Sequence, residues 1–180
     1  MYLRPSLQLA TSLRAMTEVI IPAIDQSNKM AVEQAHLVVG MLSLLNTYLP
    51  VSFAYDMDEL QRSVALHDEI VRITKSPPPA EPASHEAAEV AAARTLLEAP
   101  PISPDQLELA VRTMRAALGA LVTTTFEHGD EEERQAVGRA VLTSAKDQLL
   151  RERVLMVSQG WESQPETLPP LSDLILTAAA

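Results

Sequence analysis

The chain contains no cysteine, little glycine and few aromatic residues. Its 180 residues include 5 Gly, 1 Trp, 3 Tyr and 2 Phe. Without cysteine the chain forms no disulfide, no thiolate zinc site, no iron–sulfur cluster and no cysteine nucleophile. The scarcity of aromatic residues disfavours a β-rich fold, whereas the 25 alanines and 25 leucines favour helices.

Clustered basic residues are also missing. The chain has 14 Lys and Arg against 24 Asp and Glu, and its net charge is −10 at pH 7. The basic residues are scattered and mostly adjoin acidic ones. Because a phosphate-binding surface needs grouped Lys and Arg, we expect no binding to nucleic acid.

Long hydrophobic runs are absent too. The longest stretch without Asp, Glu, Lys or Arg covers residues 34–55, and it is interrupted by His36, Asn46 and Pro50. This is too short an apolar run for a membrane span, which needs about 18 residues, so we interpret it as a buried helix. The N-terminus shows no apolar leader of the secretory type, and we expect a cytoplasmic protein with no membrane partner.

Motifs that carry common chemistries do not occur. The sequence has no Gly-x-Ser-x-Gly elbow, no Gly-x-x-x-x-Gly-Lys-Ser/Thr loop and no Gly-x-Gly-x-x-Gly turn. We therefore assign no catalytic, cofactor-binding or metal-binding residue and expect no cofactor. These absences favour a protein that is not an enzyme.

The hydrophobic periodicity predicts an all-α fold. Apolar residues at Leu9, Leu13, Met16 and Ile20 mark one face of a long first helix over residues 6–49, which Pro22 should kink or split near residues 19–21. We expect about five helices in an antiparallel bundle that forms a single domain over residues 1–161. Residues 162–180 form a short C-terminal extension whose apolar residues should dock on this chain or on a partner.

Capping and proline signals divide the rest of the chain. A capping box at residues 56–59 should open a second helix after a turn at residues 50–55. The proline-rich segment 77–83 should be an extended connector between the two halves. A third helix should run from Ser84 to about residue 98. A capping box at Ser103 and acidic residues from Asp130 should open the fourth and fifth helices.

The second half of the first helix is apolar around most of its circumference. Its narrow polar stripe consists of small residues at Gly40 and Ser43, which suits close contact with another helix. A helix that is apolar nearly all round is buried all round, so it is either the central helix or a subunit interface. From this helix and the apolar tail we expect a homodimer.

Two constellations support alternative functions. Glu33 and His36 have the Glu-x-x-His spacing of di-iron bundles and could serve a metal-dependent enzyme, although no second copy of the motif exists. Tyr48, Phe53 and Tyr55 could line a small apolar pocket for a ligand or sensing function. The leading hypothesis remains a non-enzymatic, dimeric interaction or accessory protein, with a protein partner and a small-molecule ligand left open.

Overall fold

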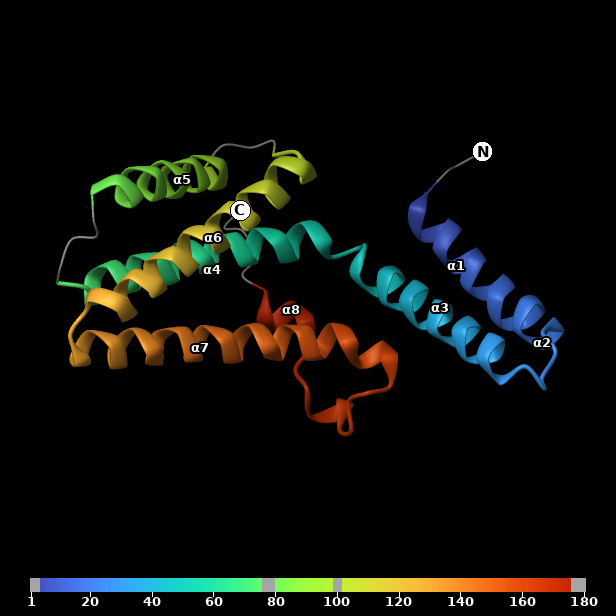
Figure 1. Cartoon of the computed structure of the whole chain (residues 1–180). Helices are drawn as coiled ribbons and strands as arrows, with labels where there is room; N and C mark the ends of the chain where they lie inside the picture. Colours follow the sequence, from blue (N-terminus) through green and yellow to red (C-terminus); the bar gives the residue numbers. More distant parts are fainter. Residues whose placement is uncertain (1–3, 76–79, 99–101, 176–180) are drawn as a thin grey trace. The chain divides into compact units, whose positions relative to one another are not determined.

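The computed structural model describes residues 4–75, 80–98 and 102–175, and within these ranges every regular element is helical (Figure 1). The all-α class is thereby confirmed. The chain divides into two compact units: a hairpin unit, Met1–Ser52 with Leu150–Leu174, and a core unit, Phe53–Leu149 with Ile175–Ala180. Each unit is described separately. Whether residues 1–161 fold as one domain stays a prediction.

The hairpin unit begins with two helices that lie side by side (Figure 1). Helix α1 (Pro5–Ala15) continues into a π-helical turn, η1 (Met16–Ile20), and a short α2 (Ile21–Ala23), and α3 follows at Lys29–Tyr48. The first helix is therefore split just after Pro22, and the prediction of one long helix kinked there is wrong, because the chain reverses direction between Ala23 and Lys29.

Local chemistry explains this reversal. Pro22 lacks a backbone donor, and the backbone at Ile24 is extended (ψ 139°). The carboxylate of Asp25 then accepts hydrogen bonds from the backbone and hydroxyl of Ser27. The side chain of Asn28 accepts the N–H of Ala31 and caps α3. A turn and a cap thus follow the proline directly, which ends one helix and starts the next.

The core unit contains α5 (Ala80–Glu98), α6 (Pro104–His128), α4 (Ser52–Ile73) from its second residue onward, and most of α7 (Glu131–Met156). One apolar cluster joins α4, α5 and α6 through Leu60, Val90 and Met114, among others. A second joins α4, α6 and α7 through Ile70, Leu121 and Val137. The described core residues of α4 and α6 therefore hold the other two helices in place.

Two helix starts differ from the prediction. Helix α4 begins at Ser52, so residues 52–55 are helical and the carboxylates of Asp58 and Glu59 lie within the helix instead of capping it. Helix α5 begins at Ala80, so residues 80–83 are helical and not part of an extended connector. Pro82 is tolerated there because donors in the first helical turn have no intrahelical partner. Residues 76–79 lie outside the described residues.

Other boundaries agree with the sequence. Ser103 and Gln106 form the predicted reciprocal capping box at the start of α6. Gly160 adopts a left-handed conformation (φ 71°) after α7 and the 3₁₀ turn η2 (Val157–Gln159), as expected for a residue that ends a helix.

The C-terminal extension contains the short helices η3 (Pro165–Thr167) and α8 (Leu171–Leu174). Leu171 and Leu174 are partly buried, and docking of the extension stays a prediction. Among the described residues no single helix is long and apolar enough to cross a membrane. The broken pair Lys29–Tyr48 and Ser52–Ile73 meets the length and composition requirement only when its two helices are counted together.

Candidate functional site

Helix α3 carries an exposed apolar face. Although the helix is apolar around most of its circumference, Ala35 is its one buried residue. The sequence pattern predicted either a central helix or a subunit interface. Half of the residues of α3 are exposed, so α3 is not a central helix buried within this chain, and its role as a subunit interface stays a prediction. A second, unoccupied side of the helix therefore remains after it has packed against α1.

The exposed side chains form a continuous stripe. Met30, Leu37, Met41 and Leu45 are 70%, 54%, 63% and 49% exposed. Their spacings of seven, four and four residues place them on one side of the helix, and Val38 and Leu49 extend the patch. We call these six residues the α3 face. Together they expose on the order of 500 Å² of apolar surface, which is at the upper end for a monomer and is often functional.

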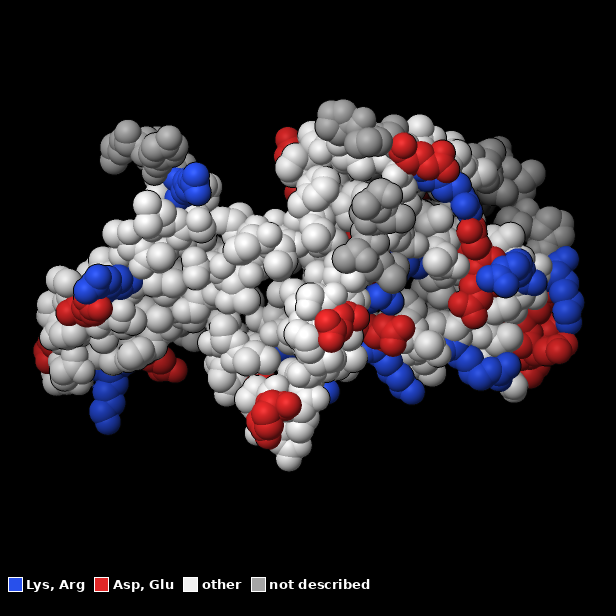
Figure 2. All heavy atoms as spheres, turned by 180° about the vertical axis from the view of Figure 1, so that it is seen from behind, with Lys and Arg blue, Asp and Glu red and all other residues white. Residues whose placement is uncertain are grey.

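Charge is sparse around the α3 face and is confined to its N-terminal end, where Lys29 and Glu33 flank Met30. No Asp, Glu, Lys or Arg occurs between residues 34 and 55. In the view of Figure 2, charged side chains are sparse over the hairpin formed by α1 and α3 and are numerous over the core unit. The face thus combines exposed apolar area with a lack of charge, in a chain whose net charge is −10.

Gly40 makes the close contact that the sequence suggested, but its partner is not a long helix. The Nε2 atom of Gln159, in η2, donates a hydrogen bond to the carbonyl oxygen of Gly40 at 2.8 Å. A Cβ atom on Gly40 would lie 3.0 Å from Oε1 of the same side chain. Gly40 therefore faces the C-terminal segment of its own hairpin unit.

An ion pair within the hairpin unit brackets Gln159 in the sequence. The guanidinium of Arg153 donates to both carboxylate oxygens of Glu162, at 2.8 and 2.9 Å. This contact lowers the pKa of Glu162, chiefly through the side-chain hydrogen bond, and raises the pKa of Arg153. The two residues flank η2 and Gly160, so the pair closes the loop that positions Gln159 against α3.

The three aromatic residues of the predicted pocket differ in environment. Tyr55 is buried in α4, whereas Phe53 is 45% exposed and Tyr48, at the end of α3, is partly buried. Tyr48 belongs to the hairpin unit and the other two belong to the core unit. A ligand pocket formed by all three stays a prediction.

Glu33 and His36 are both exposed on α3. Within the described residues, no group of three or more His, Asp or Glu side chains is arranged to hold a metal ion. To bind a metal ion, Glu33 and His36 would thus need ligands that the described residues do not supply. Metal-dependent catalysis by these two residues stays a prediction.

Two buried carboxylates in α4 were missed by the sequence analysis. Asp58 is fully buried, and both of its oxygens accept from Nε of Arg62 one turn later, at 3.0 and 2.9 Å. Glu59 is buried as well and pairs with Arg115 of α6. The i,i+4 spacing of Asp58 and Arg62 was a visible signal, but the same acidic residues also match a helix cap.

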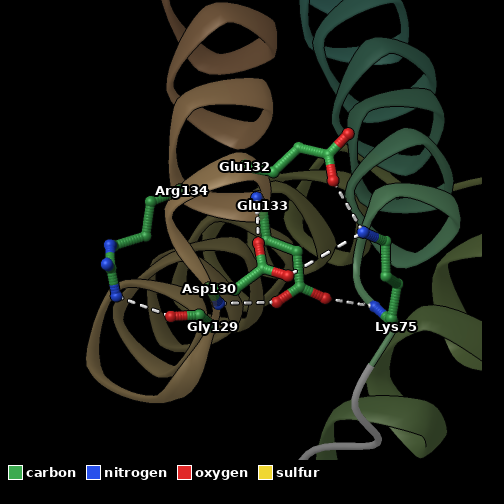
Figure 3. Close-up of polar contacts among 6 residues, drawn as sticks. All are labelled: Lys75, Gly129, Asp130, Glu132, Glu133 and Arg134. Atoms are coloured by element: carbon green, nitrogen blue, oxygen red, sulfur yellow. Dashed lines mark hydrogen bonds and ion pairs between the residues drawn. The ribbon is translucent and has the colours of Figure 1, made fainter.

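A polar clamp joins the end of α4 to the start of α7 (Figure 3). Asp130 and Glu133 form a capping box, in which each side chain accepts the backbone N–H of the other at 2.8 Å. The second oxygen of Glu133 accepts the backbone N–H of Lys75, and Nζ of Lys75 donates to Glu132 at 2.9 Å. These hydrogen bonds lower the pKa of Glu133 and of Asp130, and the contact with Glu132 raises the pKa of Lys75.

The clamp has a structural role. The acidic side chains lie at the positive end of the α7 dipole and occupy backbone donors that α7 itself cannot satisfy. The sequence analysis expected the run 130–133 to open a helix, and this is confirmed. The bond to Lys75 is tertiary and had no sequence signal.

A groove of about 430 Å³ runs between α5 and α6. Its lining residues are mostly small or apolar: Ala88, Glu89, Ala92, Ala93, Leu96, Gln106, Leu109, Ala110 and Thr113. No sequence motif pointed to it, because the groove arises from two alanine-rich faces that meet only in the folded unit.

Comparisons with protein-family models, curated protein sequences and solved structures yield no significant match to this chain.

Proposed function

We propose that the chain is a non-enzymatic interaction protein that self-associates into a homodimer through the α3 face. The scaffold in this proposal is an antiparallel helical bundle. The single observation that carries the proposal is the exposed stripe of Met30, Leu37, Met41 and Leu45 on one side of α3. In a monomer this apolar surface is exposed to water. Its burial in a dimer is favourable by a free energy proportional to the buried area.

Charge favours a second copy as the occupant. In a two-fold symmetric dimer the same patch faces itself, so a patch with a net charge faces a patch of the same net charge. Most of this acidic chain would be repelled by its copy, whereas the stretch 34–55 has no charged residue to repel. The α3 face is therefore suited to pairing with itself.

The area of the α3 face and the spacing of its residues are compatible with a dimer interface. A standard interface buries about 800 Å² on each partner, and neighbouring residues of α1 would have to complete the area of the α3 face. Leu7 and Val19 of the hairpin are also exposed, at 59% and 64%. Apolar residues spaced three and four positions apart can interlock between two helices as ridges and grooves.

The test is the solution mass of the native protein and of two variants. Met41→Asp places a carboxylate at the centre of the α3 face, and Thr47→Asp places one at an exposed position of α3 outside that face. Size-exclusion chromatography with light scattering should give twice the chain mass for the native protein and Thr47→Asp, and one chain mass for Met41→Asp. Circular dichroism shows whether each variant is folded.

The proposal is refuted if the native protein is monomeric at every concentration from about 1 µM upward. Equal dissociation by both variants would also refute it, because a general charge effect would then explain the result. A folded Met41→Asp dimer would place the interface elsewhere.

A further inference from the structure

The groove between α5 and α6 has walls and a floor that suit a packed helix. On α5, Ala88, Ala92 and Leu96 lie one turn apart on the same side, and on α6, Gln106, Ala110 and Thr113 do the same. Ala93 is buried and forms part of the floor. Small side chains on both helices allow a third backbone to approach closely, and ridges of its side chains can then enter the groove.

One edge of the groove is apolar and exposed. Leu109, which lines the groove on α6, is 57% exposed, and Leu96 on α5 is partly buried. A volume of about 430 Å³ accommodates a few apolar side chains, whereas a flat helix surface accommodates none. This is the geometry of recognition in which an amphipathic helix places residues spaced three and four positions apart into a groove.

The described charged residues around the groove carry a net negative charge. Glu89 lines the groove, and Asp105 lies next to the lining residue Gln106 in the first turn of α6. Glu108 and Arg112, on the same helix, pair with each other at 2.7 Å and so cancel in net charge. A partner with Lys or Arg beside its apolar ridge would therefore match the groove in sign.

The same charges disfavour a second copy of this chain. A copy carries a net charge of −10 and would bring further carboxylates to an acidic groove. The α3 face lacks this obstacle, because it is uncharged.

From this shape and charge we infer that the α5–α6 groove is a docking site for a basic amphipathic helix of a partner protein. Apolar side chains of the partner enter between Ala92 and Leu109, and its basic side chains face Glu89 and Asp105. The inference does not rest on dimerisation, since the groove and the α3 face belong to different units of the chain.

The experiment uses the full chain and a synthetic peptide of about 18 residues, long enough to form a helix on binding, with Leu at three- and four-residue spacing and Lys elsewhere. A matched peptide carries Glu in place of every Lys. Fluorescence anisotropy measures binding to the native protein and to two variants of exposed alanines on α5: Ala92→Phe fills the groove, and Ala91→Phe adds the same ring outside it. Circular dichroism checks that both variants fold.

We expect the Lys peptide to bind the native protein and Ala91→Phe equally, Ala92→Phe at least tenfold more weakly, and the Glu peptide to bind none of them. Equal affinity of the Lys peptide for both variants would overturn the inference, because binding would then be a general attraction to an acidic protein. So would binding of the Glu peptide. The solution masses of the two variants are also compared without peptide. If they differ, a second copy of the chain occupies the groove, and the inference is overturned.

Discussion

The side chain of Gln159 packs closely against Gly40: its Nε2 donates to the Gly40 carbonyl at 2.8 Å, and its Oε1 would lie only 3.0 Å from a Cβ added at Gly40. The two residues are 119 positions apart in the sequence. Glycine inside a helix is normally less favourable than alanine. Its presence in α3 is explained here by the close approach of Gln159.

This relationship predicts coupling between the two positions. In the native background, Gly40→Ala should gain little stability, because the new methyl group displaces Gln159. In a Gln159→Ala background the same substitution should stabilise by about 0.5–1 kcal/mol, the usual gain for alanine over glycine in a helix. Urea unfolding of the four proteins measures both effects. An identical effect of Gly40→Ala in the two backgrounds would contradict the contact.

The clamp around Glu133 predicts a loss of stability in acid. The pKa values of Glu133 and Asp130 are lowered in the folded chain, so the unfolded chain binds more protons at acidic pH. Their contribution to stability is therefore fully present at neutral pH and is lost as the pH falls below about 4–5 toward the folded pKa values. Melting temperatures measured between neutral pH and pH 3 should decline over that window.

The variant Glu133→Gln tests the origin of this decline. It should lower the melting temperature at neutral pH by roughly 2–4 °C, because a carboxylate that accepts two backbone donors is replaced, and it should flatten the acid decline. Glu132→Gln is the matched control, since Glu132 is exposed and contacts the side chain of Lys75. Equal slopes for Glu133→Gln and the native protein would show that other carboxylates cause the decline.

Two arginine ion pairs of α6 should differ in strength. Arg115 pairs with Glu59, whose side chain is only 7% exposed, whereas Arg112 and Glu108 are both about 70% exposed. Arg115→Ala removes a partner of a buried carboxylate and should destabilise the chain by about 1–3 kcal/mol. Arg112→Ala should change stability by less than about 0.5 kcal/mol. Denaturant unfolding compares the two variants, and equal losses would mean that burial of Glu59 does not set the strength of its pair.

The elements that the sequence predicted correctly have local causes. The capping box at Ser103 and the left-handed Gly160 depend on residues within a few positions of one another, so their chemistry is visible in the sequence. The first helix was predicted too long because hydrophobic periodicity is also a local signal. The apolar period continues on both sides of Pro22, and periodicity does not record that the turn of Asp25 and the cap of Asn28 reverse the chain.

The candidate interaction surfaces were visible only in part. The sequence showed that the second half of the first helix is apolar and uncharged, but not which of its residues face solvent. It interpreted Asp58 and Glu59 as a cap because acidic residues before an apolar run suit that role equally well. Their partners, Arg62 and Arg115, lie on the same helix and on α6, so burial of these carboxylates depends on how the helices pack.

Composition and local spacing thus determined the all-α class, most of the helix boundaries and the acidic character of this chain. These depend on backbone propensity, capping and charge, which act between near neighbours in the sequence. Tertiary structure alone decided that Gln159 meets Gly40, that Glu133 binds Lys75, and that α5 and α6 leave a groove between them. Such features depend on which helix faces meet, and that follows from the packing of the whole chain.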